Sequence, residues 1–232
     1  MLQRNSIDNP LYTRKGSQFM LSVAATPPYS LFDGKDYASM SSSDPDKYKF
    51  IEYHKWKFKA KLFSPLAPMA VKRTPVLMTR VEYGFLGSYN KHKRSPFETF
   101  YMGGDGMSGY SSTYATETIG LRGYENGSIA GNGGYNSYGY AYSRLAMELR
   151  YPFLLEPSST IYGLVFVEAG NAWRDLKSFN PFDLKRSAGV GVRIFLPMIG
   201  LMGIDWAYGF DKVDGARSAG GSNFHFIIGQ EF

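Results

Sequence analysis

Apolar and charged residues alternate most clearly in the segment 55–62. Its odd positions are all lysine, and its even positions read Trp56, Phe58, Ala60 and Leu62. Because successive side chains of a strand point to opposite faces, this segment predicts a strand with one basic face and one apolar face. A helix would mix lysines and aromatic rings around its whole circumference, so the strand interpretation is preferred.

The same period of two returns toward the C-terminus. In 201–210 the even positions carry large apolar residues, and the odd positions between them are Gly203, Asp205, Ala207 and Gly209. Counting such segments predicts about eight strands, near 17–28, 47–66, 69–86, 138–153, 159–173, 184–197, 200–211 and 222–232. Several exceed the roughly 9–11 residues that a tilted strand needs to cross a bilayer.

The connections between these strands alternate in length. The turn at 197–200 is short, whereas the connections 29–46, 87–137 and 212–221 are long and rich in Gly, Ser, Asp and Tyr. Outer-membrane barrels show this alternation, but a soluble β-sandwich or lipocalin-like barrel also buries one face of each strand. Small residues opposite aromatic ones favour the membrane version. We therefore predict an all-β, antiparallel transmembrane β-barrel with Trp56, Phe58, Val190 and Trp206 turned to lipid.

Composition agrees with this fold class. The 232 residues include 18 Tyr, 17 Phe and 26 Gly, but no Cys, which excludes zinc-finger, iron–sulfur and disulfide frameworks. No run of about 18 apolar residues exists, so no transmembrane helix is predicted. The net charge of +6 sits largely in alternating strands, so nucleic acid is not a predicted partner. The first sixteen residues lack an apolar signal-peptide core, and we expect a mature or truncated piece.

Several spaced motifs resemble the BamA family of outer-membrane insertases, especially in the form found in Bacteroidetes-like bacteria. The segment Ile119-Gly120-Leu121-Arg122-Gly123-Tyr124 is similar to the family's Val-Arg-Gly-Phe/Tyr loop motif, and 96–104 is similar to the lead-in before it. Segments 147–152 and 166–173 match two family strands, and 186–191 and 224–232 match the end of the barrel. The resemblance spans essentially the whole chain.

This resemblance implies the second half of a sixteen-stranded barrel, with the N-terminal strands and the periplasmic POTRA domains absent. It implies that the connection 87–137 folds back into the lumen, where Arg122 is held against acidic wall residues. Glu148 and Glu168 lie on the lumen parity of their strands and are the predicted partners. Gly123 would allow close backbone approach or a positive φ beside the arginine, and Tyr124 would cap the contact by stacking. Without the family, Arg122 would be interpreted as an exposed loop cation.

The closing strand 222–232 is the second predicted element. Its apolar residues Phe224, Phe226, Ile228 and Phe232 share one parity. In the resembling family, the first and last strands pair weakly, and that seam opens toward lipid. An unpaired strand edge is a template for adding another strand.

Other motifs give weaker evidence of function. Residues 104–109 match GxGxxG, but they neither follow a buried parallel strand nor open a helix. The segment 44–46 lacks the remaining ligands of a calcium loop, and no metal site is predicted. The three histidines form no nucleophile motif. We find no catalytic constellation, so neither an enzyme nor a cofactor is predicted. The lysines of 55–61 are interpreted as a wetted lumen wall that meets loop acids such as Asp105 or Glu117.

The predicted function is a bacterial outer-membrane assembly factor that folds and inserts β-barrel proteins. Its expected partners are outer-membrane lipids, nascent outer-membrane β-barrel proteins and accessory assembly lipoproteins. One alternative is a pore of the same superfamily that translocates a polypeptide or lipid. Another is a free-standing eight-stranded barrel that serves as an anchor or an enzyme. The long connection argues against the latter, because side chains already fill an eight-stranded lumen.

Overall fold

The computed structural model describes residues 1–41, 44–106, 117–129, 138–156, 158–198, 200–213 and 220–228. Nine strands form one antiparallel sheet in the order β1-β2-β3-β4-β7-β8-β9-β10-β11, and a short parallel pair, β5 and β6, forms a second sheet. The strands are β1 (Leu2–Asn5), β2 (Gly16–Ala25), β3 (His54–Pro65), β4 (Val76–Gly87), β5 (Phe100–Met102), β6 (Glu117–Ile119), β7 (Ala141–Glu156), β8 (Ser159–Trp173), β9 (Lys185–Leu196), β10 (Gly200–Gly209) and β11 (Gly221–Ile228).

The eight predicted strands correspond to β2–β4 and β7–β11. The short strands β1, β5 and β6 were not predicted, because three or four residues give no readable period. The predicted strand 47–66 begins seven residues too early. Its first part forms a 3-10 turn, Pro45–Tyr48, and the Asp44 side chain accepts a hydrogen bond from the Asp46 N–H at its start. Asp44 thus has a capping role in this turn.

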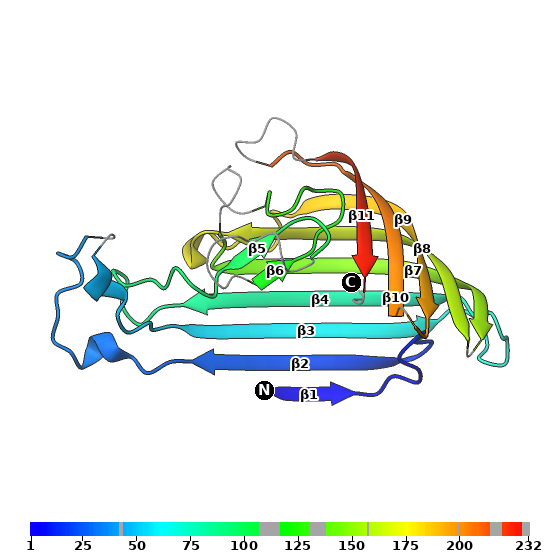
Figure 1. The fold of residues 1–232 in the computed structure, drawn as a ribbon, viewed down its shortest axis with the longest axis horizontal. Helices are drawn as coiled ribbons and strands as arrows, with labels where there is room; N and C mark the ends of the chain where they lie inside the picture. The colour runs from blue at the N-terminus through cyan, green and yellow to red at the C-terminus, as the bar shows by residue number, and fades with distance from the viewer. Residues whose placement is uncertain are drawn as a thin grey trace.

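The large sheet is strongly curved, and β5 and β6 lie against its concave side, where β5 contacts β7 and β8 (Figure 1). No helix of the described residues is long and apolar enough to cross a membrane. Within the described residues, β1 and β11 are the two ends of the sheet and do not pair with each other. The all-β, antiparallel prediction is confirmed.

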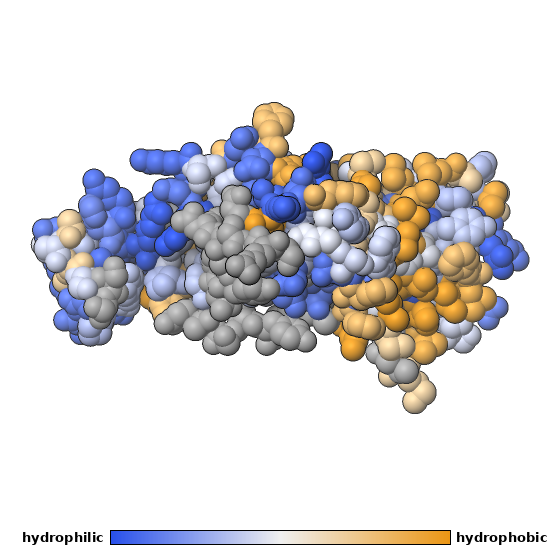
Figure 2. All heavy atoms as spheres, turned by 90° about the horizontal axis from the view of Figure 1, so that it is seen from above, coloured by the Kyte–Doolittle hydropathy of each residue, from blue (hydrophilic) through white to orange (hydrophobic). Residues whose placement is uncertain are grey.

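The two faces of the sheet carry the chemistry that the alternation predicts. On the convex face, Trp56, Phe58, Val190 and Trp206 are 46%, 38%, 47% and 40% exposed. On the concave face of β3, Lys55 is buried. Figure 2 shows apolar residues gathered over one end of the molecule, whereas the end that carries the connection 26–53 is polar. The aromatic rings therefore face outward and the lysines inward, as predicted.

The concave face is not uniformly polar, however. Where the hairpin turns lie, Met78 and Phe166 belong to an apolar cluster that is covered by Tyr12. The Tyr12 hydroxyl lies 3.0 Å from the backbone carbonyl oxygen of Thr74 and 3.2 Å from that of Arg150, and its single proton can be donated to either, so the N-terminal segment is held across the sheet. Nearer the other end, Phe100, Leu121 and Ile129 from the long connection pack on Tyr142. The core of this molecule thus lies between the sheet and what folds into it.

Candidate functional site

The tip of the long connection lies against the concave face as a buried ion cluster. Arg122 is 0% exposed, and Nη2 of its guanidinium lies 2.6 Å from Oε1 of Glu148 and 2.7 Å from Oε1 of Glu168. The Arg122 backbone N–H also donates to Oε2 of Glu168 at 2.9 Å. The three residues that the sequence singled out for this contact are therefore brought together.

A third carboxylate completes the cluster and was not predicted as a partner. Oδ2 of Asp205, on β10, accepts from Nη1 of Arg122 at 3.0 Å. The signal for it was present in the sequence, since Asp205 stands among Gly203, Ala207 and Gly209 on the small-residue parity of its strand. A lone carboxylate there would face the lumen and the loop rather than lipid.

Each of these carboxylates also has an arginine partner on the sheet itself. Arg150 donates to Glu148 through Nε and Nη2, and Arg144 donates to Glu168. Arg193 meets Asp205 with a two-pronged fork, at 2.6 and 2.8 Å. At this cluster, the sheet therefore contributes three ion pairs of its own. Arg122 is the additional cation, supplied by the loop, that joins all three.

The guanidinium of Arg122 is also stacked on an aromatic ring. Its Cζ lies 3.5 Å from the centroid of the Phe166 ring, which belongs to β8. A planar guanidinium can stack on a ring and hold carboxylates at its edge at the same time, which an ammonium cannot do. The three surrounding carboxylates hold the pKa of Arg122 above its ordinary value despite burial, which by itself would lower it. Arg122 is therefore charged at any physiological pH.

Gly123 has the conformation that was expected of it. Its φ is +87°, and a Cβ there would lie 2.9 Å from the backbone nitrogen of Gly209 and from Cβ of Ser187. A Cβ on Gly209 would in turn lie 2.4 Å from the carbonyl oxygen of Gly123. The loop and β10 thus meet backbone to backbone, and side chains at either glycine would separate them.

Tyr124 continues the contact along the sheet. We expected it to stack on Arg122; the ring that lies over the guanidinium is that of Phe166, while the Tyr124 hydroxyl donates to the Arg186 carbonyl at 2.7 Å. The same hydroxyl accepts from the Asp211 N–H. Burial raises the pKa of Tyr124 to about 12, so it remains a donor.

Three consecutive loop residues therefore contact five consecutive strands. Arg122 reaches β7, β8 and β10, Tyr124 reaches β9, and Gly123 reaches β11, where its N–H donates to Nε2 of His225 at 2.9 Å. This arrangement can fix the relative positions of the last five strands.

The segment 117–129, which carries Arg122, is tied at its start to the other half of the sheet. Glu117, on β6, lies 3.1 Å from Nζ of Lys55, 3.0 Å from Lys57 and 3.8 Å from Lys59. The prediction that the lysine row meets Glu117 is confirmed. Burial raises the pKa of Glu117, but the lysines outweigh this effect and hold the pKa below its ordinary value.

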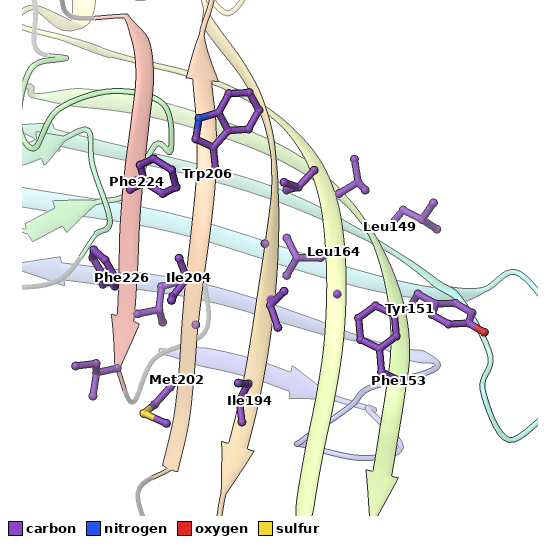
Figure 3. A pocket seen from close by; sticks show the side chains of 18 residues that line it. Leu149, Tyr151, Phe153, Leu164, Ile194, Met202, Ile204, Trp206, Phe224 and Phe226 are labelled. Atoms are coloured by element: carbon purple, nitrogen blue, oxygen red, sulfur yellow. The ribbon is translucent and has the colours of Figure 1, made fainter.

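The closing strand presents two different faces. Phe224, Phe226 and Ile228 are exposed on the convex side, whereas His225 and Ile227 are buried. Phe232, the fourth predicted apolar residue, lies outside the described residues. Beside this strand, the convex face of β7–β11 has an apolar hollow of about 920 Å³, lined in part by Phe224, Phe226 and Trp206 (Figure 3).

Other candidate sites from the sequence receive no support. Within the part of the chain that the structure describes, no group of three or more His, Asp or Glu side chains is placed to hold a metal ion. The first residues of the GxGxxG match, 104–106, follow the short strand β5, and residues 107–109 lie outside the described ranges.

Comparisons with known proteins agree with this fold. The crystal structure of BamA from Haemophilus ducreyi lacking POTRA domains 1–3 superposes with a TM-score of 0.62 at 19% identity. That match covers 97% of this chain and 40% of the other, so the chain spans well under half of the protein that it resembles. No curated protein matches in sequence. The family model that describes the Omp85 superfamily domain matches residues 1–232, and the chain therefore belongs to the Omp85 superfamily.

Proposed function

We propose that this chain is the C-terminal half of a sixteen-stranded outer-membrane barrel that folds and inserts other β-barrel proteins through a lateral seam. The observation that carries this proposal is the pairing of β11, the last strand of the described sheet. It pairs with β10 along one edge, and no described strand pairs with its other edge. The match to 40% of the Haemophilus ducreyi BamA chain supports the assignment as a part of a larger barrel.

A free strand edge presents a row of backbone N–H and C=O groups that another strand can satisfy. In a bilayer this pairing is strongly favoured, because hydrocarbon offers no other hydrogen-bond partner. An unfolded barrel protein could therefore add its strands to β11 one after another. Such templating needs neither a cofactor nor a catalytic residue.

Five residues would serve as a latch that keeps the loop inside the lumen: Arg122, Gly123, Tyr124, Glu148 and Glu168. It would fix the shape of the wall that ends in β11, because it contacts every strand from β7 to β11. POTRA domains upstream and accessory lipoproteins would deliver the substrates in the periplasm.

The convex face supports a location in the bacterial outer membrane. Phe224, Phe226 and Ile228 are more than half exposed and lie beside the apolar hollow. Such a surface fits lipid acyl chains. The outer-membrane lipids next to the seam would thus be the medium into which a substrate barrel is released.

A second candidate is a translocation pore of the same superfamily. The lysines of β3 favour it, since Lys57 and Lys59 have 24% and 33% exposed side chains on the concave face and could line a polar path. The third alternative, a free-standing small barrel, finds no support, because the described sheet does not close between β1 and β11.

Disulfide capture would test the seam. The full-length protein carrying Phe224→Cys is reconstituted in phospholipid vesicles and given an unfolded outer-membrane barrel protein with a cysteine in its terminal strand. We expect a disulfide-linked intermediate, followed by a heat-modifiable folded substrate in the membrane. Val165→Cys is the matched control, since Val165 is equally apolar and 55% exposed but lies on β8 within the sheet.

Equal capture at both positions would mean that contact is unspecific and would rule out the seam. Substrate recovered in the vesicle lumen, protected from protease and not embedded in the bilayer, would favour the translocation pore.

A further inference from the structure

Gly123 is held by two inward-facing side chains of β11. Its N–H donates to Nε2 of His225 at 2.9 Å, and its carbonyl oxygen accepts from Nδ2 of Asn223 at 3.0 Å. Asn223 also donates to the Gly221 carbonyl at 3.3 Å, which orients its amide. An accepting Nε2 belongs to a neutral imidazole that carries its proton on Nδ1. Both backbone polar groups of the loop glycine thus depend on the closing strand.

The strand register explains why this grip falls beside the ion cluster. His225 lies opposite Asp205 in the β10–β11 pair, and directly opposed side chains of one face are neighbours. Asp205 holds Arg122, so the dipeptide Arg122-Gly123 lies across two paired strands.

The contact of Gly123 with β11 differs from the latch contacts with β7–β10, because these strands are paired differently. β7–β10 each pair with a described strand on both sides, whereas the only described strand that pairs with β11 is β10. For β11, the two hydrogen bonds to Gly123 are therefore an additional restraint from the inside of the barrel. The hydrogen bond to His225 is buried and the one to Asn223 is partly buried, so leaving either unmade is costly, and strand and loop stabilise each other.

We propose that Asn223 and His225 are positioning residues that fasten the closing strand to the Arg122 loop, so that release of the loop and release of the seam strand are coupled. This coupling rests on the proposed function, because only a seam strand needs to be released. It assigns the inner face of β11 a role distinct from that of its backbone edge.

Hydrogen exchange of the full-length protein in phospholipid vesicles would test the coupling. His225→Leu removes the acceptor, and Asn223→Asp replaces the donor by an acceptor of the same shape. We expect roughly tenfold faster exchange in 220–228 for each, the effect of one lost hydrogen bond. His225→Gln keeps an acceptor and should restore most of the protection. Phe224→Leu, on the exposed face of the same strand, is the matched control and should change little.

Coupling between two elements is reciprocal, so the same variants must also speed exchange in 117–129. Unchanged exchange in both segments would overturn the proposal. So would a uniform rise across β7–β11 that His225→Gln fails to rescue, since that pattern reports a general loss of stability. Substrate insertion is measured separately: coupled exchange together with failed capture at β11 would count against the insertase and leave the fastening intact.

Discussion

The loop segment 117–129 is held by ion pairs at two places, its start and its tip. The two sets of contacts differ in burial. At its start, Glu117 meets lysines whose side chains are 6–33% exposed. At its tip, Arg122 meets Glu148, Glu168 and Asp205, and all four side chains are at most 1% exposed. Exposed pairs contribute little because water and salt screen them, whereas a buried pair is strongly destabilised when one partner is removed.

The difference also shows in the choice of residue. The less buried set uses lysine, a flexible point charge, along one strand. The buried set uses arginine, whose planar fork satisfies carboxylates from several directions and stacks on Phe166. From this contrast we infer that the tip fixes geometry and that the start of the loop guides it electrostatically. The four predictions below separate these roles.

Arg122→Ala should have the largest effect. Each wall carboxylate keeps its own partner, Arg150, Arg144 or Arg193, so the loss falls on the attachment of the loop. We expect the free energy of unfolding to fall by at least about 3 kcal/mol, because the variant loses three buried hydrogen bonds between charged groups, each worth about 1.5–3 kcal/mol. Denaturant unfolding in detergent and protease cleavage within 117–129 would measure it.

Arg94→Ala is the matched control, because Arg94 pairs with Asp175 where both side chains are more than 40% exposed. It should change the unfolding free energy by less than about 1 kcal/mol. A loop that stays as protease-resistant in Arg122→Ala as in the wild type would contradict the latch.

Gly123→Ala should have an intermediate effect. The new Cβ would lie 2.9 Å from the Gly209 nitrogen in a residue with φ +87°, so the loop must shift outward. Overpacking of this kind costs about 1–3 kcal/mol. Gly34→Ala separates backbone strain from lack of room, since Gly34 has φ +64° but no atom within 4 Å of its Cβ position. Thermal unfolding of the two variants is compared, and equal losses would show that close approach at Gly123 is unimportant.

Glu117→Gln should have the smallest effect, about 1 kcal/mol or less, and it should shrink further in high salt. The same loss in low and high salt would contradict a screened, guiding role. Denaturant unfolding at two ionic strengths would measure it.

The pH dependence of the same pair follows from the lowered pKa of Glu117. A carboxyl whose pKa is lower in the folded state stabilises that state fully above its unfolded pKa, near 4.5, and loses this contribution as the pH falls through the folded pKa. The difference between wild type and Glu117→Gln should therefore be constant from about pH 6 to 7, decrease as the pH falls below the unfolded pKa, and vanish only below the lowered folded pKa. A difference that grows as the pH falls would contradict this sign.

The alternation of residues by itself determined the strands and their two faces, since the geometry of a strand makes side-chain parity a local property. It placed Glu148 and Glu168 inside and the aromatic rings outside without any knowledge of neighbours. The resemblance of the segment around Arg122 to a family motif then named the loop that meets them. The predicted start of the strand 47–66 was wrong, because a capped 3-10 turn at Pro45–Tyr48 competes locally with the strand.

Only the tertiary structure decided which residues meet. Asp205, Phe166 and His225 come from strands about 45 to 100 residues away from the loop, and their contact with it depends on register and curvature, which no local period encodes. The same holds for Gly209, which reads in the sequence as one more small residue. A side chain at this position would collide with the loop backbone that lies against it. The sequence thus set the direction of each side chain, and the curvature of the sheet around the loop set its partner.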